Sequence, residues 1–251
     1  EDTDEVRNRP EWTQGIIDAL AWIGISADDS HFEGPHFQSE YAAAHIDAAN
    51  RLHEAGAAYY CDLTAEQVQE RARQAGTSGY DGYSRNRGLG PGPGRVLRFR
   101  VPDGVTVVHD LVRGDVSFDN STIEDFVLVR GNGTPVFLLA NVVDDIEMGI
   151  THVIRGDDHV NNTPRQVNIL RALGAEPPAY AHVPMILGAD GKRLSKRHGA
   201  VNVIQYREEG FLPEALLNYL VRLGWSHGDR EIFSVDELIE LFDIADVNKA
   251  A

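Results

Sequence analysis

A segment rich in glycine and proline divides the chain. Residues 76–94 end in Gly88-Leu-Gly-Pro-Gly-Pro-Gly94. Because proline cannot donate a ladder hydrogen bond and glycine weakens the interior of either element, neither a packed helix nor a central strand can run through this stretch. Patterns of alternating strands and helices resume at Pro135. We therefore expect one α/β fold interrupted by an inserted module at about residues 51–130.

Composition narrows the class of protein. The 251 residues include 23 Lys and Arg against 39 Asp and Glu, and 42% are hydrophobic, which is typical of a folded soluble protein. The net charge of −16 argues against indiscriminate binding to nucleic acid or anionic membrane, although a local basic patch could still bind RNA. No apolar run approaches the roughly 18 residues of a membrane span. Cys61 is the single cysteine, so we expect a cytoplasmic protein without disulfides.

Helices are predicted wherever apolar residues recur with helical spacing between start and stop signals. The first runs from Pro10 towards Gly24, and the second runs from Tyr41 towards Gly56. Capping boxes or N-terminal prolines open the others, at Thr64-x-x-Gln67, Thr163-Pro164, Pro213 and Ser234-x-x-Glu237.

Strands are predicted at Val96–Val101, Val105–Val112, Phe126–Arg130, Val136–Asn141 and Thr151–Arg155. Alternation of strands and helices on both sides of an insertion is typical of a doubly wound parallel sheet. The ligands of such sheets lie beyond the carboxyl ends of the strands, where Arg155 would stand.

The most informative segment for chemistry is Gly191-Lys-Arg-Leu-Ser-Lys-Arg-His-Gly199. Two lysines and two arginines within six residues, bracketed by glycines, form a cationic loop suited to phosphates. From composition alone a solvated basic turn explains the segment equally well. The order of the residues favours the phosphate interpretation.

Arg193-Leu-Ser-Lys-Arg197 resembles the KMSKS-type loop of class I aminoacyl-tRNA synthetases, in the form found in bacterial glutamyl-tRNA synthetases. The resemblance covers nearly the whole chain. It includes these segments in the family's order: Glu1-Asp-Thr-Asp4, Gly34-Pro-His-Phe-Gln-Ser-Glu40, Asn141-Val-Val-Asp-Asp145, Arg155-Gly-Asp-Asp-His159, Asn162-Thr-Pro-Arg-Gln166, Gly210-Phe-Leu-Pro-Glu-Ala-Leu216 and Leu223-Gly-Trp-Ser226. The fold it implies is a split Rossmann-like sheet with an inserted α+β acceptor-binding module and a helical stem-contact region.

The resemblance implies that ATP, with Mg²⁺, is bound next to the basic loop. Lys196 and Arg193 would be catalytic, with Lys196 and Ser195 on the ATP phosphates. Arg193 stands where the family usually has Lys, which keeps the charge but changes the donor geometry. Met185 and Ile186 would hold the adenine, largely through backbone groups.

The resemblance also implies a glutamate site. Arg155 would clamp the side-chain carboxylate, because an Arg fork matches a carboxylate with two parallel hydrogen bonds. Glu1 would receive the α-ammonium, and Phe137, Asn141 and Asp158 would complete the site. Phe137 stands where a Tyr is expected. Without the resemblance, Arg155 would more simply be an ion-pair partner of Asp157 or Asp158, and Glu1 an acidic first turn of a helix.

Two other groups could suggest a metal. Asp144 and Asp145 form a carboxylate pair, for which we favour structural or ribose-facing hydrogen bonding. Magnesium would then enter with ATP and not through a protein cage. Many relatives carry a zinc knuckle in the inserted module, but Cys61 alone cannot build a four-ligand site, so we expect no protein-bound zinc.

Arginines cluster where the resemblance places the acceptor end of tRNA. Arg85, Arg87 and Arg95, followed by Arg98 and Arg100, fall in sixteen residues without Asp or Glu. Arginine contacts to phosphates position an RNA backbone. The alternative is a set of exposed strand residues paired with acidic groups elsewhere.

The resemblance divides the chain into four parts. Residues 1–50 would be the first Rossmann half, 51–130 the inserted module, 131–187 the second half, and 188–251 the KMSKS-type loop and stem-contact helices. The family's His-x-Gly-His motif would lie upstream of Glu1, and no anticodon-binding domain is expected within these residues. We therefore expect a catalytic-core fragment that is inactive alone.

The implied activity is the attachment of glutamate to tRNA through glutamyl-adenylate, by a monomer. A paralogue that glutamylates the modified base queuosine on tRNA is an alternative, as is a non-catalytic tRNA-binding relative. The segments 157–162 and 195–199 favour the first reading over the paralogue. The choice between tRNA for glutamate and tRNA for glutamine cannot be derived from these residues.

Overall fold

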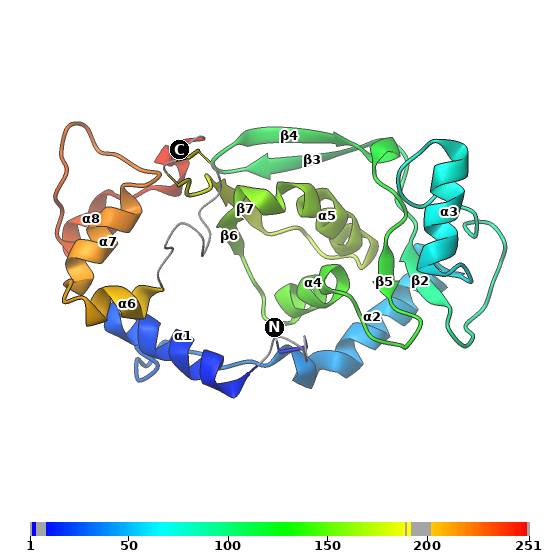
Figure 1. The fold of residues 1–251 in the computed structure, drawn as a ribbon, viewed down its shortest axis with the longest axis horizontal. Coiled ribbons are helices and arrows are strands. Elements are labelled where there is room, and N and C mark those ends of the chain that lie inside the picture. The colour runs from blue at the N-terminus through cyan, green and yellow to red at the C-terminus, as the bar shows by residue number, and fades with distance from the viewer. Residues whose placement is uncertain (1, 4–8, 189, 192–201, 250–251) are drawn as a thin grey trace.

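The computed structural model describes residues 2–3, 9–188, 190–191 and 202–249. The chain forms an elongated α/β fold with two sheets (Figure 1). An antiparallel sheet lies at one end with α3 (Ala65–Ala75), a mixed sheet lies in the middle, and the helices α6 (Val203–Glu208), α7 (Pro213–Val221) and α8 (Val235–Leu241) lie at the other end.

The antiparallel sheet has the order β1 (Ala58–Cys61), β2 (Val96–Phe99), β5 (Val127–Val129). Its inner face carries Leu97, Phe99 and Leu128, which are almost fully buried. They join one core with apolar residues of α2 (Ala42–Glu54), α4 (Phe137–Glu147) and α5 (Thr163–Ala172). This shared core connects the sheet to the helices that flank the mixed sheet.

The mixed sheet has the order β4 (Gly114–Asp119), β3 (Val105–Asp110), β7 (Ala179–Val183), β6 (His152–Gly156). Strands β6 and β7 run parallel, with Arg155 opposite His182, and α5 makes the crossover between them. Strand β3 is parallel to β7 and forms an antiparallel hairpin with β4. The sheet that carries Arg155 is therefore mixed in the described residues, and not purely parallel as predicted.

All six predicted helices are confirmed. The first two are α1 (Pro10–Trp22) and α2, and Pro213 opens α7. Both capping boxes form: the hydroxyls of Thr64 and Ser234 accept from the backbone N–H of Gln67 and Glu237, whose side chains accept in return. The short helix α6 was not predicted.

One element was predicted with the wrong type. Residues 136–141 were predicted as a strand, but they open helix α4. The run Val136-Phe-Leu-Leu-Ala is continuously apolar and fits either element over so few residues. Extended to Glu147, it shows helical spacing, because Leu139, Val142 and Val143 are buried on one side.

Three short strands, β1, β4 and β7, were not predicted. The β3–β4 hairpin falls within residues 51–130, yet β3 pairs with β7 from the following segment. Part of the segment assigned to the inserted module thus shares a sheet with β6 and β7. The proposed boundaries of the four parts stay a prediction.

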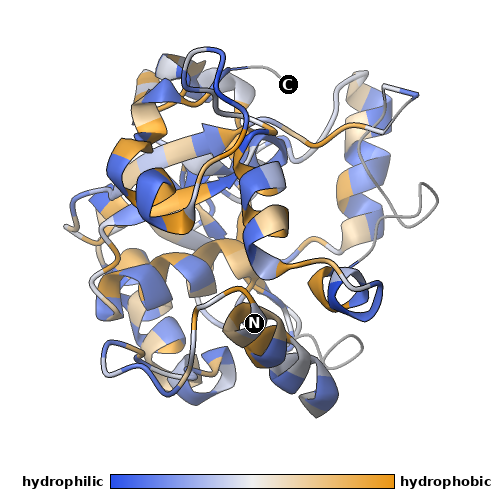
Figure 2. Cartoon of the chain, turned by 90° about the vertical axis from the view of Figure 1, so that its left-hand side faces the viewer, coloured by the Kyte–Doolittle hydropathy of each residue, from blue (hydrophilic) through white to orange (hydrophobic). Residues whose placement is uncertain are grey.

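The C-terminal helices pack on the end of the mixed sheet. Trp225 and Phe233 are buried with Val112 and with Ala181 of β7, and partly buried residues of α7 and α8 surround them. Figure 2 shows that the helices carry apolar residues among polar ones, as expected of helices with one buried side. Helix α1 contacts α6, so the N-terminal helix lies beside the helices that follow the mixed sheet (Figure 1).

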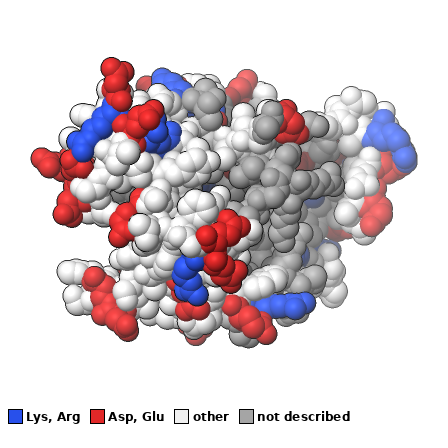
Figure 3. Space-filling view, turned by 60° about the vertical axis from the view of Figure 1, so that its left-hand side comes forward, with Lys and Arg blue, Asp and Glu red and all other residues white. Residues whose placement is uncertain are grey.

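Acidic side chains spread over the face shown in Figure 3, and basic groups lie among them. This distribution agrees with the net charge of −16. Among the described residues, no helix has the length and apolar character needed to cross a membrane.

Candidate active site

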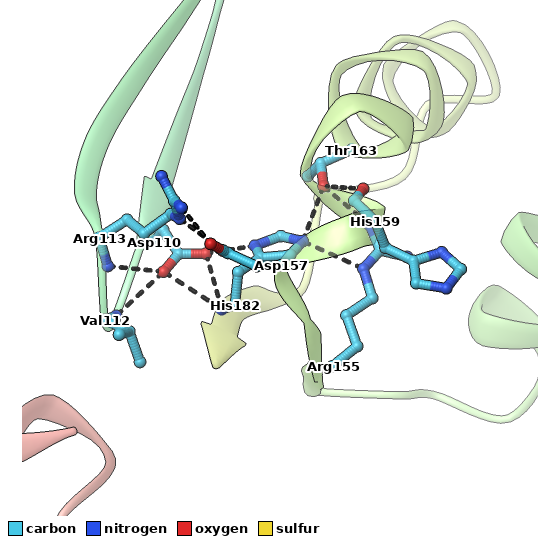
Figure 4. Close-up of polar contacts among 8 residues, drawn as sticks. All are labelled: Asp110, Val112, Arg113, Arg155, Asp157, His159, Thr163 and His182. Carbon is cyan, nitrogen blue, oxygen red and sulfur yellow. Dashed lines mark hydrogen bonds and ion pairs between the residues drawn. The ribbon is translucent and has the colours of Figure 1, made fainter. Parts of the chain in front are cut away.

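Arg155 is the centre of a polar network at the end of β6 (Figure 4). Its side chain is partly buried, and its guanidinium lies over the ring of Tyr180 with 5.5 Å between the carbon Cζ and the ring centroid. Nε donates to Nε2 of His182 at 3.1 Å, and Nη2 donates to Oγ1 of Thr163 at 2.7 Å. Strand β6, strand β7 and the start of α5 thus fix one side of the guanidinium.

His182 is held in turn by Asp110 at the end of β3. The Nδ1 atom of His182 lies 2.5 Å from Oδ2 of Asp110, and both side chains are almost completely buried. The carboxylate also accepts from the backbone N–H groups of Val112, Arg113 and His182. Although burial raises the pKa of Asp110, the hydrogen bonds from Arg113 and His182 outweigh it and hold that pKa below its ordinary value. Asp110 is therefore ionised at neutral pH.

Arg155 makes no ion pair with a carboxylate of the described residues, whereas Asp157 pairs with Arg113 and Asp158 lies 3.9 Å from His159. Burial lowers the pKa of Arg155, and electrostatic interactions with Tyr180 and Asp145 oppose this shift. An arginine stays protonated in any case. The alternative that Arg155 is the ion-pair partner of Asp157 or Asp158 is thus not what the geometry shows.

One face of α4 points towards this network. Phe137, Asn141 and Asp145 are spaced four residues apart and therefore share a side of the helix. The ring of Phe137 lies 6.4 Å from that of His159, and Asn141 accepts a hydrogen bond from Gln166 at 2.6 Å. Burial, followed by the charge of Asp144, raises the pKa of Asp145 to about 6, while Arg155 opposes the shift. The structure therefore brings Phe137 and Asn141 to the same region as Arg155.

Met185 and Asp158 meet at Gly156, the last residue of β6. A Cβ atom on Gly156 would lie 2.7 Å from Oδ1 of Asp158 and 3.3 Å from the sulfur of Met185, so a larger residue here would displace these side chains. Met185 and Ile186 also line an apolar cavity of about 450 Å³ together with residues that include Ile154, Leu220 and Trp225. The cavity joins the end of β6 to the C-terminal helices.

Four of the predicted site residues, Glu1, Arg193, Ser195 and Lys196, lie outside the described residues. Their roles stay predictions from the sequence.

The arginines predicted to contact tRNA have partners within the chain. Arg85 donates to the backbone oxygen of Val101 at 2.7 Å, and Arg95 donates to that of Gly90 at 2.7 Å. Arg87 is exposed, lies over the ring of Tyr83 and pairs with Asp62 at 2.6 Å. Arg98 is buried and donates to the backbone of Asp125. Arg87 is thus the most accessible of the predicted set.

The carboxylate pair on α4 has two different environments. Asp144 is buried and accepts from Gln38 at 2.7 Å, and it contacts Nε2 of His45 at 2.6 Å. This is the structural hydrogen bonding that we favoured for it. Cys61 is buried and free. Across the described part of the chain, no three His, Cys, Asp or Glu residues are grouped as metal ligands.

Comparison with known proteins identifies the family. The family model for the catalytic domain of class I tRNA synthetases for glutamate and glutamine matches residues 1–251 of this chain. The chain belongs to this synthetase family. It is 56% identical over 253 residues to the glutamate–tRNA ligase of Thermobifida fusca strain YX, and 55% identical over 253 residues to that of Salinispora arenicola strain CNS-205. All of the chain is covered in both cases, but it spans only 53% of each of these synthetases.

Solved structures of the family agree with the fold. One match is the crystal structure of a glutamate–tRNA ligase from Elizabethkingia meningosepticum CCUG26117 in complex with its amino acid. The match covers all of this chain and 58% of the ligase chain, with a TM-score of 0.85 and 33% identity. The glutamate–tRNA synthetase of Elizabethkingia anophelis matches with the same TM-score and 34% identity. The resemblance stated from the sequence motifs is therefore confirmed at the level of the family.

The residues that hold Arg155 were not among the predicted site residues. Thr163 was recognised only as a helix start, and His182 and Asp110 were not recognised at all. His182 and Asp110 are 72 residues apart in the chain and meet only because β3 pairs with β7. Their buried polar character is visible only once this pairing is known.

Proposed function

We propose that this chain belongs to the catalytic region of a glutamate–tRNA ligase, which joins glutamate to tRNA through glutamyl-adenylate. The observation that carries the proposal is Arg155: a partly buried guanidinium held by two neutral acceptors, with no described carboxylate in contact. A buried charge without an opposite charge is costly, so such a group calls for an anionic ligand. The side-chain carboxylate of glutamate supplies one.

The free donors of Arg155 would set the amino-acid specificity. The two described hydrogen bonds occupy Nε and one proton of Nη2. One Nη1 proton and the second Nη2 proton stand side by side and can meet both oxygens of a carboxylate. Phe137, Asn141 and Asp158 would line the same site, with Glu1 receiving the α-ammonium.

ATP would bind between the end of β6 and the basic loop. Met185 and Ile186 line an apolar cavity, which supports their assignment to the adenine. Lys196, with Arg193 and Ser195, would stabilise the phosphates while a carboxylate oxygen of glutamate attacks the α-phosphorus and pyrophosphate leaves. Mg²⁺ would accompany the ATP phosphates and screen their charge. A ribose hydroxyl of the 3′-terminal nucleotide of tRNA would then attack the adenylate carbonyl, and AMP would leave.

The finer architecture belongs to the same proposal. The mixed sheet would be the second half of a split Rossmann-like core, residues 51–130 would include an acceptor-binding module, and α6 to α8 would form the stem-contact region. Arg85, Arg87 and Arg95 would face the tRNA acceptor end. The full-length protein would act as a cytoplasmic monomer.

The decisive test is aminoacylation by the full-length protein. It should charge tRNA for glutamate with glutamate, in an ATP-dependent reaction that releases pyrophosphate. A parallel assay with tRNA for glutamine shows whether the protein charges that tRNA with glutamate as well. Transfer of glutamate to the queuosine base, with no charging of the 3′ end, would support the paralogue instead. Binding of tRNA without glutamate-dependent pyrophosphate exchange would support the non-catalytic relative.

A further inference from the structure

The hydrogen-bond partners of His182 determine which of its ring nitrogens carries a proton. Asp110 is ionised and can only accept, so Nδ1 of His182 must be the donor in their 2.5 Å contact. Arg155 can only donate, so Nε2 of His182 must accept from Nε of Arg155. Burial lowers the pKa of His182, although its contact with Asp110 opposes the shift. All three facts select the neutral ring with its proton on Nδ1.

A neutral ring has a specific consequence for Arg155. The neutral ring fixes the Nε side of the guanidinium and leaves its positive charge in place. An aspartate at the same place would neutralise that charge. Thr163 fixes one Nη2 proton in the same way, through a neutral hydroxyl oxygen. With Nε and one Nη2 proton occupied, the end of the fork, formed by Nη1 and Nη2, is the part left for a ligand carboxylate (Figure 4).

Resting on the proposed function of Arg155, we propose that His182 is a positioning residue for glutamate selection, and that Asp110 acts through it. Asp110 is itself fixed by three backbone N–H groups, two of them in the turn after β3. The ring of His182 is packed against that of Tyr180, with their centroids 6.1 Å apart. The backbone thus fixes the carboxylate of Asp110, which fixes the imidazole of His182, which in turn orients the guanidinium of Arg155. A guanidinium that was free to swing would bind glutamine almost as well as glutamate.

Two amide variants of His182 in the full-length protein separate this contact from mere packing. In His182→Gln the amide oxygen can reach the place of Nε2 and still accept from Arg155. In His182→Asn the shorter amide can reach Asp110 but not Arg155. We expect His182→Asn to lower kcat/KM for glutamate about tenfold or more, mainly through KM, as for the loss of one charge-assisted hydrogen bond. In His182→Asn the preference for glutamate over glutamine should narrow, and the KM for ATP should change little. In His182→Gln much of the kcat/KM for glutamate should be recovered.

His45→Asn is the matched control. His45 is also 2% exposed and also contacts a buried aspartate, Asp144, but it makes no described contact with Arg155. Its variant should lose thermal stability and keep the ratio of glutamate to glutamine activity. If His182→Asn does not fold, Thr163→Val, which removes the second neutral acceptor, takes its place with the same expected loss of preference.

The outcomes distinguish this inference from the function on which it rests. An unchanged glutamate preference in folded His182→Asn, or equal effects of His182→Asn and His182→Gln, would overturn the positioning role. If Arg155→Gln lowers the preference while His182→Asn does not, the glutamate site stands and the inference fails. If Arg155→Gln itself leaves the preference unchanged, the proposed function of Arg155 fails.

Discussion

Arg113 forms a two-pronged ion pair with Asp157, through Nε and Nη2 to the two carboxylate oxygens. The pair joins the turn between β3 and β4 to the first residue after β6, and the hydrogen bond of Asp110 to the backbone of Arg113 lies beside it. Because Asp157 is engaged in this way, the acidic neighbour of Arg155 in sequence does not neutralise it. The ion pair thus adjoins the Arg155 network through the backbone of Arg113, but it leaves the charge of Arg155 unneutralised.

Arg113→Ala should destabilise the protein by about 1–2 kcal/mol, because it leaves a partly buried carboxylate without its cation. The exposed pair of Arg230 and Glu237 offers a comparison, and Arg230→Ala should cost less because solvent already screens it. Thermal unfolding of both full-length variants measures the difference. Equal losses of stability in the two variants would mean that the Arg113–Asp157 pair stabilises the protein no more than the exposed pair does.

Asp145 should make stability depend on pH. Its pKa is about 6 in the folded chain against an ordinary 3.8, so between these values the folded state binds more protons than the unfolded state. Stability contributed by protonated Asp145 is therefore present at low pH and is lost as pH rises towards 6. The stability of Asp145→Asn relative to the unchanged protein should increase from pH 4 to pH 7. Unfolding midpoints at several pH values test this, and a constant difference would contradict the raised pKa.

The helices could be predicted from the sequence where local signals decide the structure. Capping boxes at Thr64 and Ser234 and a proline at Pro213 predicted helices that form. Prediction from the sequence failed at residues 136–141, where a continuous apolar run has no period over so few positions. It also failed for β7, since Ala179-Tyr-Ala-His-Val183 carries a histidine whose burial depends on Asp110 from a distant strand. The family motifs predicted Arg155, but only the strand pairing shows how it is held.

The structure refines the expected effect of the arginines on tRNA binding. Arg87 is exposed, so Arg87→Ala should flatten the log–log dependence of tRNA affinity on salt by roughly 0.7–0.9, the value for one phosphate contact. Arg85→Ala and Arg95→Ala should also loosen the module, because each holds a backbone carbonyl. Affinities of the full-length protein measured over a series of salt concentrations, with melting curves alongside, separate these effects. An unchanged slope in Arg87→Ala would place the RNA surface elsewhere.

Lys196→Ala should mainly slow the activation of glutamate. A contact that strengthens as charge develops on the leaving phosphates lowers the rate more than it lowers substrate binding. A loss on the order of 10²–10³ is expected for one electrostatic stabiliser. Single-turnover adenylate formation in the presence of tRNA gives the rate. An unchanged rate would mean that the basic loop is only a solvated turn.

Arg155→Gln should reduce kcat/KM for glutamate sharply, narrow its advantage over glutamine, and leave the affinity for ATP nearly unchanged. Glutamate and glutamine are almost equal in size, so shape alone separates them poorly. A guanidinium separates them because glutamine offers it one neutral acceptor and an NH₂ group that faces other donors. Leaving that charge partly unpaired costs several kcal/mol, enough for strong rejection.

Arg155→Lys should recover only part of the activity. The ammonium restores the charge, but it cannot donate to His182, Thr163 and both oxygens of a ligand in one plane as the fork does. The measurement is amino-acid-dependent pyrophosphate exchange by the full-length protein with tRNA present, for the unchanged protein and both variants. A glutamate preference that survives in Arg155→Gln would remove Arg155 from the amino-acid site.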